Sequence, residues 1–144
     1  MSELRRKPAK KLDREIRRTA KNRCGYCLGE QKHLFAWLEI EHLRPRAKGG
    51  TTVAENLWLA CPFCNAFKGS QTHGRDPQTK RKVSLFNPRT QSWKNHFEFD
   101  SDQATILGKT ACGRATVNAL NLNHELALTT RKLCVEVGWY PPKD

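Results

Sequence analysis

Long apolar runs are missing from this sequence of 144 residues. No stretch approaches the roughly 18 consecutive apolar residues of a membrane-spanning helix, so we expect no contact with the membrane interior. The N-terminus is basic but lacks the apolar stretch of a signal peptide, which predicts a cytoplasmic protein. Internal repeats, low-complexity tracts and a convincing linker are also missing. The chain is therefore most simply a single domain over residues 1–144.

Acidic residues are scarce compared with basic ones. The chain has 26 Lys and Arg against 14 Asp and Glu, a formal net charge of +12. Residues 1–23 alone carry a net charge of +7. Such a balance favours a polyanionic partner, nucleic acid first and an acidic membrane surface second. Because many basic proteins use charge only for solubility, the charge by itself does not identify the partner.

Three regions follow from the residue pattern. In residues 1–23, a basic tail (1–9) precedes a predicted helix in which Leu12, Ile16 and Ala20 recur every four residues. One side of this helix is basic, through Arg14, Arg17, Arg18 and Lys21. That side is as easily a solvated face as a binding one.

The residue pattern of 24–70 predicts a strand, a loop, a second strand and a helix. The strands are residues 35–43 and 57–61, separated by a break at Pro45 and a turn at Gly49-Gly50. The helix is 62–69, because Pro62 is a favoured first residue and Gly69 a favoured stop.

For residues 71–144, which we call the extension, the pattern predicts a hairpin and two helices. We expect a loop over 73–80, hairpin strands in 93–100 and 104–108, and helices in 114–122 and 125–138. The fold class is therefore α+β. We expect the four tryptophans to lie in the core: Trp37, Trp58, Trp93 and Trp139.

Four cysteines have the spacing of a zinc site. Cys24 and Cys27 form one C-x-x-C pair, and Cys61 and Cys64 form another. Two such pairs complete a tetrahedron of thiolates with no open position, so this Zn²⁺ is structural. Disulfides would not persist in a cytosolic chain, and redox C-x-x-C sites need a thioredoxin-like context that is absent. Cys112 and Cys134 lack such partners and are expected to be small buried residues of the C-terminal helices.

The same region resembles the HNH endonuclease family, the ββα-metal nucleases with a four-cysteine zinc knuckle. The matching residues are Glu41-His42, Pro45, Gly49-Gly50, Glu55-Asn56-Leu57, Ala60-Cys61, Cys64-Asn65 and Lys68-Gly69. Residues from Arg75 onward also resemble small bacterial HNH proteins, common in cyanobacteria, so that the resemblance covers about four fifths of the chain.

The resemblance implies a role for each motif residue. His42 is the general base that takes a proton from the attacking water, and Asn56 ties the loop between the strands into place. Glu41 stands where the family usually has Asp, a ligand of the catalytic Mg²⁺ or Mn²⁺, and Asn65 completes that metal site. The implied reaction is hydrolysis of DNA phosphodiester bonds, leaving 3′-hydroxyl and 5′-phosphate ends.

Elementary chemistry supports these roles independently of the family. A hard divalent ion prefers carboxylate and amide oxygens, and a histidine is mostly neutral at pH 7 and can accept a proton. Neighbouring residues of a strand point to opposite faces, however. Glu41 and His42 therefore converge only if the strand twists or bulges near Arg44-Pro45.

Basic residues around the motif are expected to contact the phosphate backbone. The first candidates are Arg44, Arg46, Lys48 and Lys68. The chain shows no recognition module, so it either cleaves with little sequence preference or relies on a targeting subunit. Two rival interpretations stay open: a catalytically inactive, zinc-dependent nucleic-acid-binding or adaptor protein, and a nuclease that acts on RNA.

Overall fold

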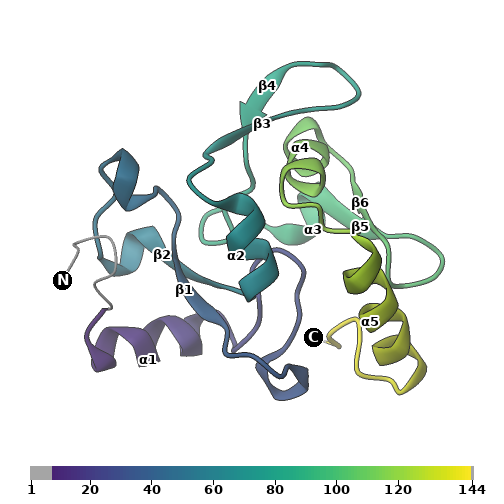
Figure 1. Ribbon diagram of the computed structural model, residues 1–144, viewed down its shortest axis with the longest axis horizontal. Helices are drawn as coiled ribbons and strands as arrows, with labels where there is room; N and C mark the ends of the chain where they lie inside the picture. Colours follow the sequence, from purple (N-terminus) through teal and green to yellow (C-terminus); the bar gives the residue numbers. More distant parts are fainter. Residues whose placement is uncertain (1–7, 144) are drawn as a thin grey trace.

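The computed structural model describes residues 8–143, so most of the expected basic tail lies outside the described residues. Helices are interspersed with three antiparallel pairs of short strands along the described residues (Figure 1). The helices and 3₁₀ turns are α1 (Lys10–Thr19), η2 (Gln31–His33), η3 (Arg46–Lys48), η4 (Ala54–Asn56), α2 (Pro62–Lys68), α3 (Trp93–His96), α4 (Ala111–Ala119) and α5 (Glu125–Glu136). The strands are β1 (Glu39–His42), β2 (Leu57–Ala60), β3 (His73–Arg75), β4 (Lys82–Ser84), β5 (Phe97–Phe99) and β6 (Ile106–Gly108). This mixture is compatible with the α+β class expected from the sequence.

Strands β1 and β2 form an antiparallel pair, and α2 follows directly. The register is continuous from Glu39 opposite Ala60 to His42 opposite Leu57. Helix α2 begins at Pro62 and ends before Gly69, as the sequence predicts, and Gly69 adopts a positive φ of 52°. Helix α2 lies against both strands. Strand β1 is shorter than the predicted 35–43, because the chain over 35–38 is irregular.

Helix α1 lies against the hairpin through its apolar side. Ile16 and Ala20 are buried, and α1 contacts β2. On the basic side, Arg17 pairs with Asp13 at 2.6 Å and donates to the carbonyl of Leu38 at 2.8 Å. At least one basic residue of this helix is therefore used to hold the start of β1.

The extension has the two predicted helices, although α4 covers Ala111–Ala119 instead of 114–122, and its strands differ from the prediction in two places. Residues 73–80, expected to be a loop, contribute β3 to a hairpin with β4. Residues 93–96, expected to be strand, form the single turn α3, and only Phe97–Phe99 pairs with β6. The buried carboxylate of Asp76 explains why a hairpin forms here in place of a loop. It accepts two hydrogen bonds from Arg114 of α4, at 2.9 and 3.0 Å, and so fixes the hairpin on α4. The local sequence pattern could not predict this contact, because Arg114 is 38 residues away from Asp76 in the chain.

One cluster of buried side chains extends from Ile16 to Leu122, and includes Tyr26, Leu57 and Phe97. The expectation that all four tryptophans are core residues is wrong, because Trp37 and Trp139 are exposed. Trp58 and Trp93 border the cluster. No helix among residues 8–143 is long and apolar enough to cross a membrane.

Candidate active site and metal centre

The four predicted cysteines come together at one point. The sulfur atoms of Cys24, Cys27, Cys61 and Cys64 all lie within 4.8 Å of one another. The Cys27 and Cys61 sulfurs are 3.8 Å apart. A Zn–S bond near 2.3 Å places tetrahedral sulfurs about 3.8 Å apart, so the cluster fits Zn²⁺. The two remaining cysteines, Cys112 and Cys134, are partly buried on α4 and α5, outside the cluster.

Backbone amides and distant side chains support this cluster. The amide of Tyr26 donates to the Cys24 sulfur, and the amide of Cys64 donates to the Cys61 sulfur, both at 3.4 Å. Hydrogen bonds to the three neighbouring thiols strongly raise the pKa of Cys64. A dication among the four sulfurs would reverse that effect, because it stabilises thiolates.

The turn between the first two cysteines is also held from the C-terminal half of the chain. Trp93 donates its ring N–H to the Tyr26 carbonyl at 2.8 Å, and the Tyr140 hydroxyl donates to the Cys27 carbonyl at 2.6 Å. The extension therefore holds residues 24–27 in place, and we call this segment the zinc turn.

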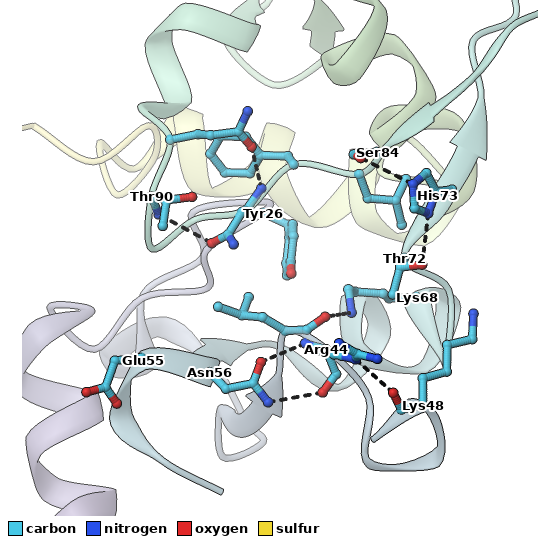
Figure 2. Close-up of a pocket in the computed structure, with 15 residues that line it drawn as sticks. Tyr26, Arg44, Lys48, Glu55, Asn56, Lys68, Thr72, His73, Ser84 and Thr90 are labelled. Atoms are coloured by element: carbon cyan, nitrogen blue, oxygen red, sulfur yellow. Dashed lines mark hydrogen bonds between the residues drawn. The ribbon is translucent and has the colours of Figure 1, made fainter. Parts of the chain in front are cut away.

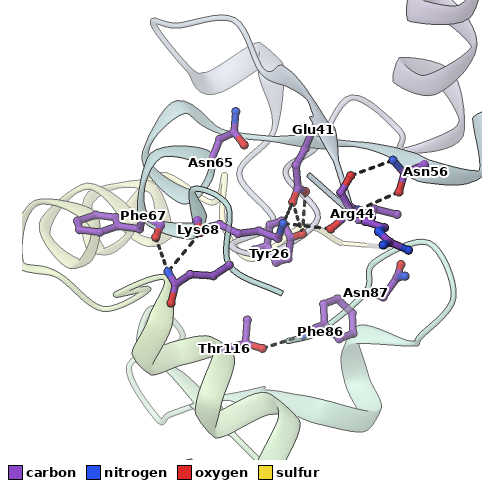
Figure 3. A network of polar contacts seen from close by, with 12 residues as sticks. Tyr26, Glu41, Arg44, Asn56, Asn65, Phe67, Lys68, Phe86, Asn87 and Thr116 are labelled. Carbon is purple, nitrogen blue, oxygen red and sulfur yellow. Dashed lines mark hydrogen bonds and ion pairs between the residues drawn. The ribbon is translucent and has the colours of Figure 1, made fainter. Parts of the chain in front are cut away.

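Glu41 faces the interior and is fully engaged. Its carboxylate accepts hydrogen bonds from the Tyr26 hydroxyl, at 2.8 and 2.7 Å, and lies 2.8 Å from the Lys68 ammonium. Figure 3 shows the carboxylate directed into this network, with the amide of Asn65 turned away from it. Burial raises the pKa of Glu41, against the lowering effect of Lys68. The side chain is 2% exposed.

His42 lies on the opposite face of β1 from Glu41, because the strand stays regular to its last residue. The expected twist or bulge that would turn both side chains to one side is not observed. The His42 ring contacts the Thr52 hydroxyl through Nε2 at 2.9 Å. Burial first, and the nearby Arg46 second, lower the pKa of His42. Both effects keep the imidazole neutral at pH 7, the form that a general base requires.

Asn65, from α2, donates to the carboxylate of Glu39 at 2.8 Å. These two residues and His42 line an open hollow of about 680 Å³ at the edge of β1 that does not pair with β2, and Glu39 and His42 reach it from opposite faces of the strand. Glu41 also contributes to its wall, although its carboxylate is turned into the Tyr26–Lys68 network. Sequence reasoning missed Glu39 and Thr52. The alternation in Glu39-Ile-Glu41-His42 was the available signal for Glu39, since it puts two carboxylates on one face of the strand.

Asn56 ties the loop between β1 and β2 as the resemblance implies. Its Oδ1 accepts from the Arg44 amide at 2.8 Å, and its Nδ2 donates to the carbonyls of Arg44 at 3.1 Å and Thr51 at 2.8 Å. Gly50 is required here, because a Cβ atom at this position would lie 1.7 Å from the Arg44 carbonyl oxygen.

The predicted phosphate-binding residues separate into three environments. Arg44 and Lys48 line a second hollow of about 640 Å³, opposite Thr72, His73 and Ser84 (Figure 2). Arg46 lines the first hollow instead, beside His42.

Lys68 is 3% exposed and paired with Glu41. Its expected surface position is not observed, because the ammonium is needed to balance a buried carboxylate.

The second hollow contains a histidine to which the sequence assigned no role. The ring of His73 lies between two hydroxyls, Thr72 at 2.9 Å and Ser84 at 3.3 Å. The β3–β4 pairing produces this arrangement, since His73 and Ser84 are cross-strand partners.

Comparison with known proteins agrees with the sequence resemblance. Residues 24–71 match the family model described as HNH endonuclease, which confirms the resemblance over that segment. The Septu protein PtuB of Bacillus thuringiensis is 28% identical over 104 residues, which is 71% of this chain and 37% of that protein. The chain thus spans much less than the full length of this relative. No solved structure matches the chain.

Proposed function

Because residues 24–71 match the HNH endonuclease family, we propose that this chain is a divalent-ion-dependent endonuclease that hydrolyses DNA. Strands β1 and β2 with helix α2 then form its ββα-metal core, braced by structural Zn²⁺. The observation that carries the proposal is the shared hollow. His42, whose pKa is lowered, reaches this hollow from one face of β1, and the carboxylate of Glu39 with the amide of Asn65 reaches it from the other face, around the edge of β1 that does not pair with β2.

His42 acts as the general base in this proposal. Its ring is partly buried and its direction is fixed by the Thr52 hydroxyl. A base held in a fixed direction and neutral at working pH can take the proton of a water attacking phosphorus. Arg46, beside it, carries a positive charge toward which a phosphate would be drawn.

The hollow also offers oxygen donors for Mg²⁺ or Mn²⁺, the ions that prefer such ligands. The residues that would hold it are a carboxylate of β1 and the amide of Asn65. When bound, such an ion neutralises charge on phosphate oxygens and stabilises the leaving oxygen. Asn56 contributes indirectly, because its three hydrogen bonds hold the loop that carries Arg44 and Arg46.

The substrate follows from charge and from the position of the basic residues. The net charge of +12 suits a polyanion. Arg44, Arg46 and Lys48 follow β1 directly, at the two hollows, where they could contact phosphates on either side of the scissile bond. Lys68 is not among these contacts, because it is buried and paired with Glu41. Targeting by another subunit and cleavage with little sequence preference both fit this arrangement.

The direct test is nicking of supercoiled plasmid DNA with Mg²⁺ or Mn²⁺. We expect His42→Ala to abolish nicking while zinc content and circular dichroism stay unchanged. His33→Ala is the matched control, because His33 stacks on Trp139 and does not line the hollow. Nicking that survives His42→Ala would rule out His42 as the base.

The same assay separates the rival functions. DNA binding by the wild-type protein without any divalent-dependent cleavage would select the inactive binding or adaptor protein. Faster cleavage of RNA than of duplex or single-stranded DNA would select an RNA substrate.

A further inference from the structure

Two carboxylates of β1 face α2, one buried and one exposed. Glu39 and Glu41 are two residues apart and so share a face of the strand. Each contacts a different residue of α2, since Glu39 accepts from Asn65 and Glu41 pairs with Lys68. Asn65 and Lys68 are three residues apart and neighbours on the helix surface. The contacts thus form an outer pair and an inner pair across the same interface.

The inner pair is a poor place for a hydrated cation. Both oxygens of Glu41 accept from Tyr26, and the Lys68 ammonium lies 2.8 Å from one of them. An ion at Glu41 would therefore lie close to a positive charge. Mg²⁺ also keeps several of its water molecules when bound to protein, and a side chain that is 2% exposed leaves no room for them.

The outer pair, Glu39 and Asn65, has the solvent exposure that a hydrated cation requires. Glu39 is exposed, and Asn65 is partly exposed beside it. Both line the hollow open to solvent at the edge of β1 that does not pair with β2, and His42 borders the same hollow from the opposite face of the strand. An amide presents its oxygen when rotated by half a turn, so the 2.8 Å contact of Asn65 Nδ2 with Glu39 can be replaced by two oxygens facing one cation.

We propose that Glu39, in place of Glu41, supplies the carboxylate ligand of the catalytic divalent ion, with Asn65 as the second protein ligand. Glu41 instead joins β1 to α2 and to the zinc turn through Lys68 and Tyr26. This assignment rests on the proposed nuclease function, which requires such an ion. It differs from the expectation that the residue directly before the histidine binds the metal.

The test measures Mn²⁺ binding directly, without DNA, on the zinc-loaded full chain. Free Mn²⁺ is followed by electron paramagnetic resonance during a titration. We expect Glu39→Gln to weaken Mn²⁺ binding about tenfold or more, as loss of a metal-site carboxylate should. Glu55→Gln is the matched control, an exposed acid of the same core that lines the other hollow, and it should leave the affinity unchanged.

Trp37 provides a second readout. It is exposed and lines the same hollow as Glu39, so Tb³⁺ bound there should show luminescence excited through this ring. The signal should be lost in Trp37→Phe and in Glu39→Gln. It should persist in Glu41→Gln, provided that this variant keeps its zinc and its circular dichroism spectrum.

The outcomes separate the two proposals. If Glu39→Gln binds Mn²⁺ as tightly as the wild type while plasmid nicking remains Mn²⁺-dependent, the Glu39 assignment is overturned and the nuclease proposal stands. If the wild-type chain neither binds Mn²⁺ nor nicks DNA, both proposals fail. Because Glu39 is exposed, its replacement should leave folding intact and give a clear result.

Discussion

The Lys68 ammonium lies 2.8 Å from the Glu41 carboxylate, and both side chains are almost completely buried. This ion pair joins the last turn of α2 to the middle of β1. Tyr26, from the zinc turn, completes it through its hydroxyl. The pair therefore connects the zinc site to the strand that carries His42, and its loss should affect the whole core.

Lys68→Met should destabilise the protein strongly. Removing one partner leaves an uncompensated buried charge, which costs about 3–5 kcal/mol of unfolding free energy. Burial already raises the pKa of Glu41 above its ordinary 4.5, and the substitution should raise it further. A raised folded-state pKa of an acid means that stability falls as pH rises above 4.5. Urea denaturation should therefore show a larger deficit at about pH 8 than at about pH 5.

Lys48→Met is the control for that experiment, because Lys48 is exposed. It should change the unfolding free energy by less than about 0.5 kcal/mol. Equal effects of the two substitutions would contradict the importance of the buried pair.

Zinc removal should unfold the core. Cys61→Ser should lose the bound zinc ion, and the wild type should lose its cooperative unfolding transition after treatment with a strong chelator. Cys134→Ser should retain one zinc ion per chain, because Cys134 lies outside the cluster. Metal analysis and circular dichroism check both. A wild-type chain that stays folded without zinc would argue against the bracing role.

Asn56→Ala should weaken both stability and cleavage. The substitution removes three hydrogen bonds that fix the loop after β1, each worth about 1 kcal/mol, so we expect a loss of about 2–3 kcal/mol. Asn95→Ala, at an exposed position of α3, serves as the control. Guanidinium denaturation measures the unfolding free energy. An unfolding free energy of Asn56→Ala equal to that of the control would contradict the role of Asn56 in fixing the loop.

Cleavage should persist in mildly acidic solution. The pKa of His42 is lowered from 6.5, by burial first and by Arg46 second, so the imidazole remains neutral below that pH. Arg46→Gln should shift the acid limb of the kcat/KM profile upward, since it removes a lowering effect. Arg44→Gln should leave the limb in place, because Arg44 lines the other hollow. The position of the limb is the measurement, because either substitution can also change substrate binding.

Acid should weaken the attachment of the β3–β4 hairpin. Hydrogen bonds from Arg114 hold the pKa of Asp76 well below its usual 3.8. A lowered folded-state pKa gives stability that is present above pH 3.8 and is lost as pH falls toward the folded value. Asp76→Asn should therefore lower the melting temperature at pH 7, with a difference that shrinks in acid. Glu98→Gln, at an exposed position of β5, is the control and should leave the melting temperature at pH 7 nearly unchanged.

The sequence by itself determined the parts of this protein that depend on local spacing. The two C-x-x-C pairs predicted the zinc cluster, because a single turn brings each pair of sulfurs together. Pro62 and Gly69 predicted the limits of α2 through their backbone preferences. The motif also identified Asn56, whose partners at positions 44 and 51 lie within the same loop.

Only the tertiary structure decided which carboxylate of β1 is open to solvent. Alternation along the strand puts Glu39 and Glu41 on one face, but it does not say which of them is covered. Tyr26 and Lys68, from two separate elements, cover Glu41 and leave Glu39 beside Asn65. The reason is physical: a buried charge needs a partner, and partners 15 and 27 residues away in the chain meet only after folding.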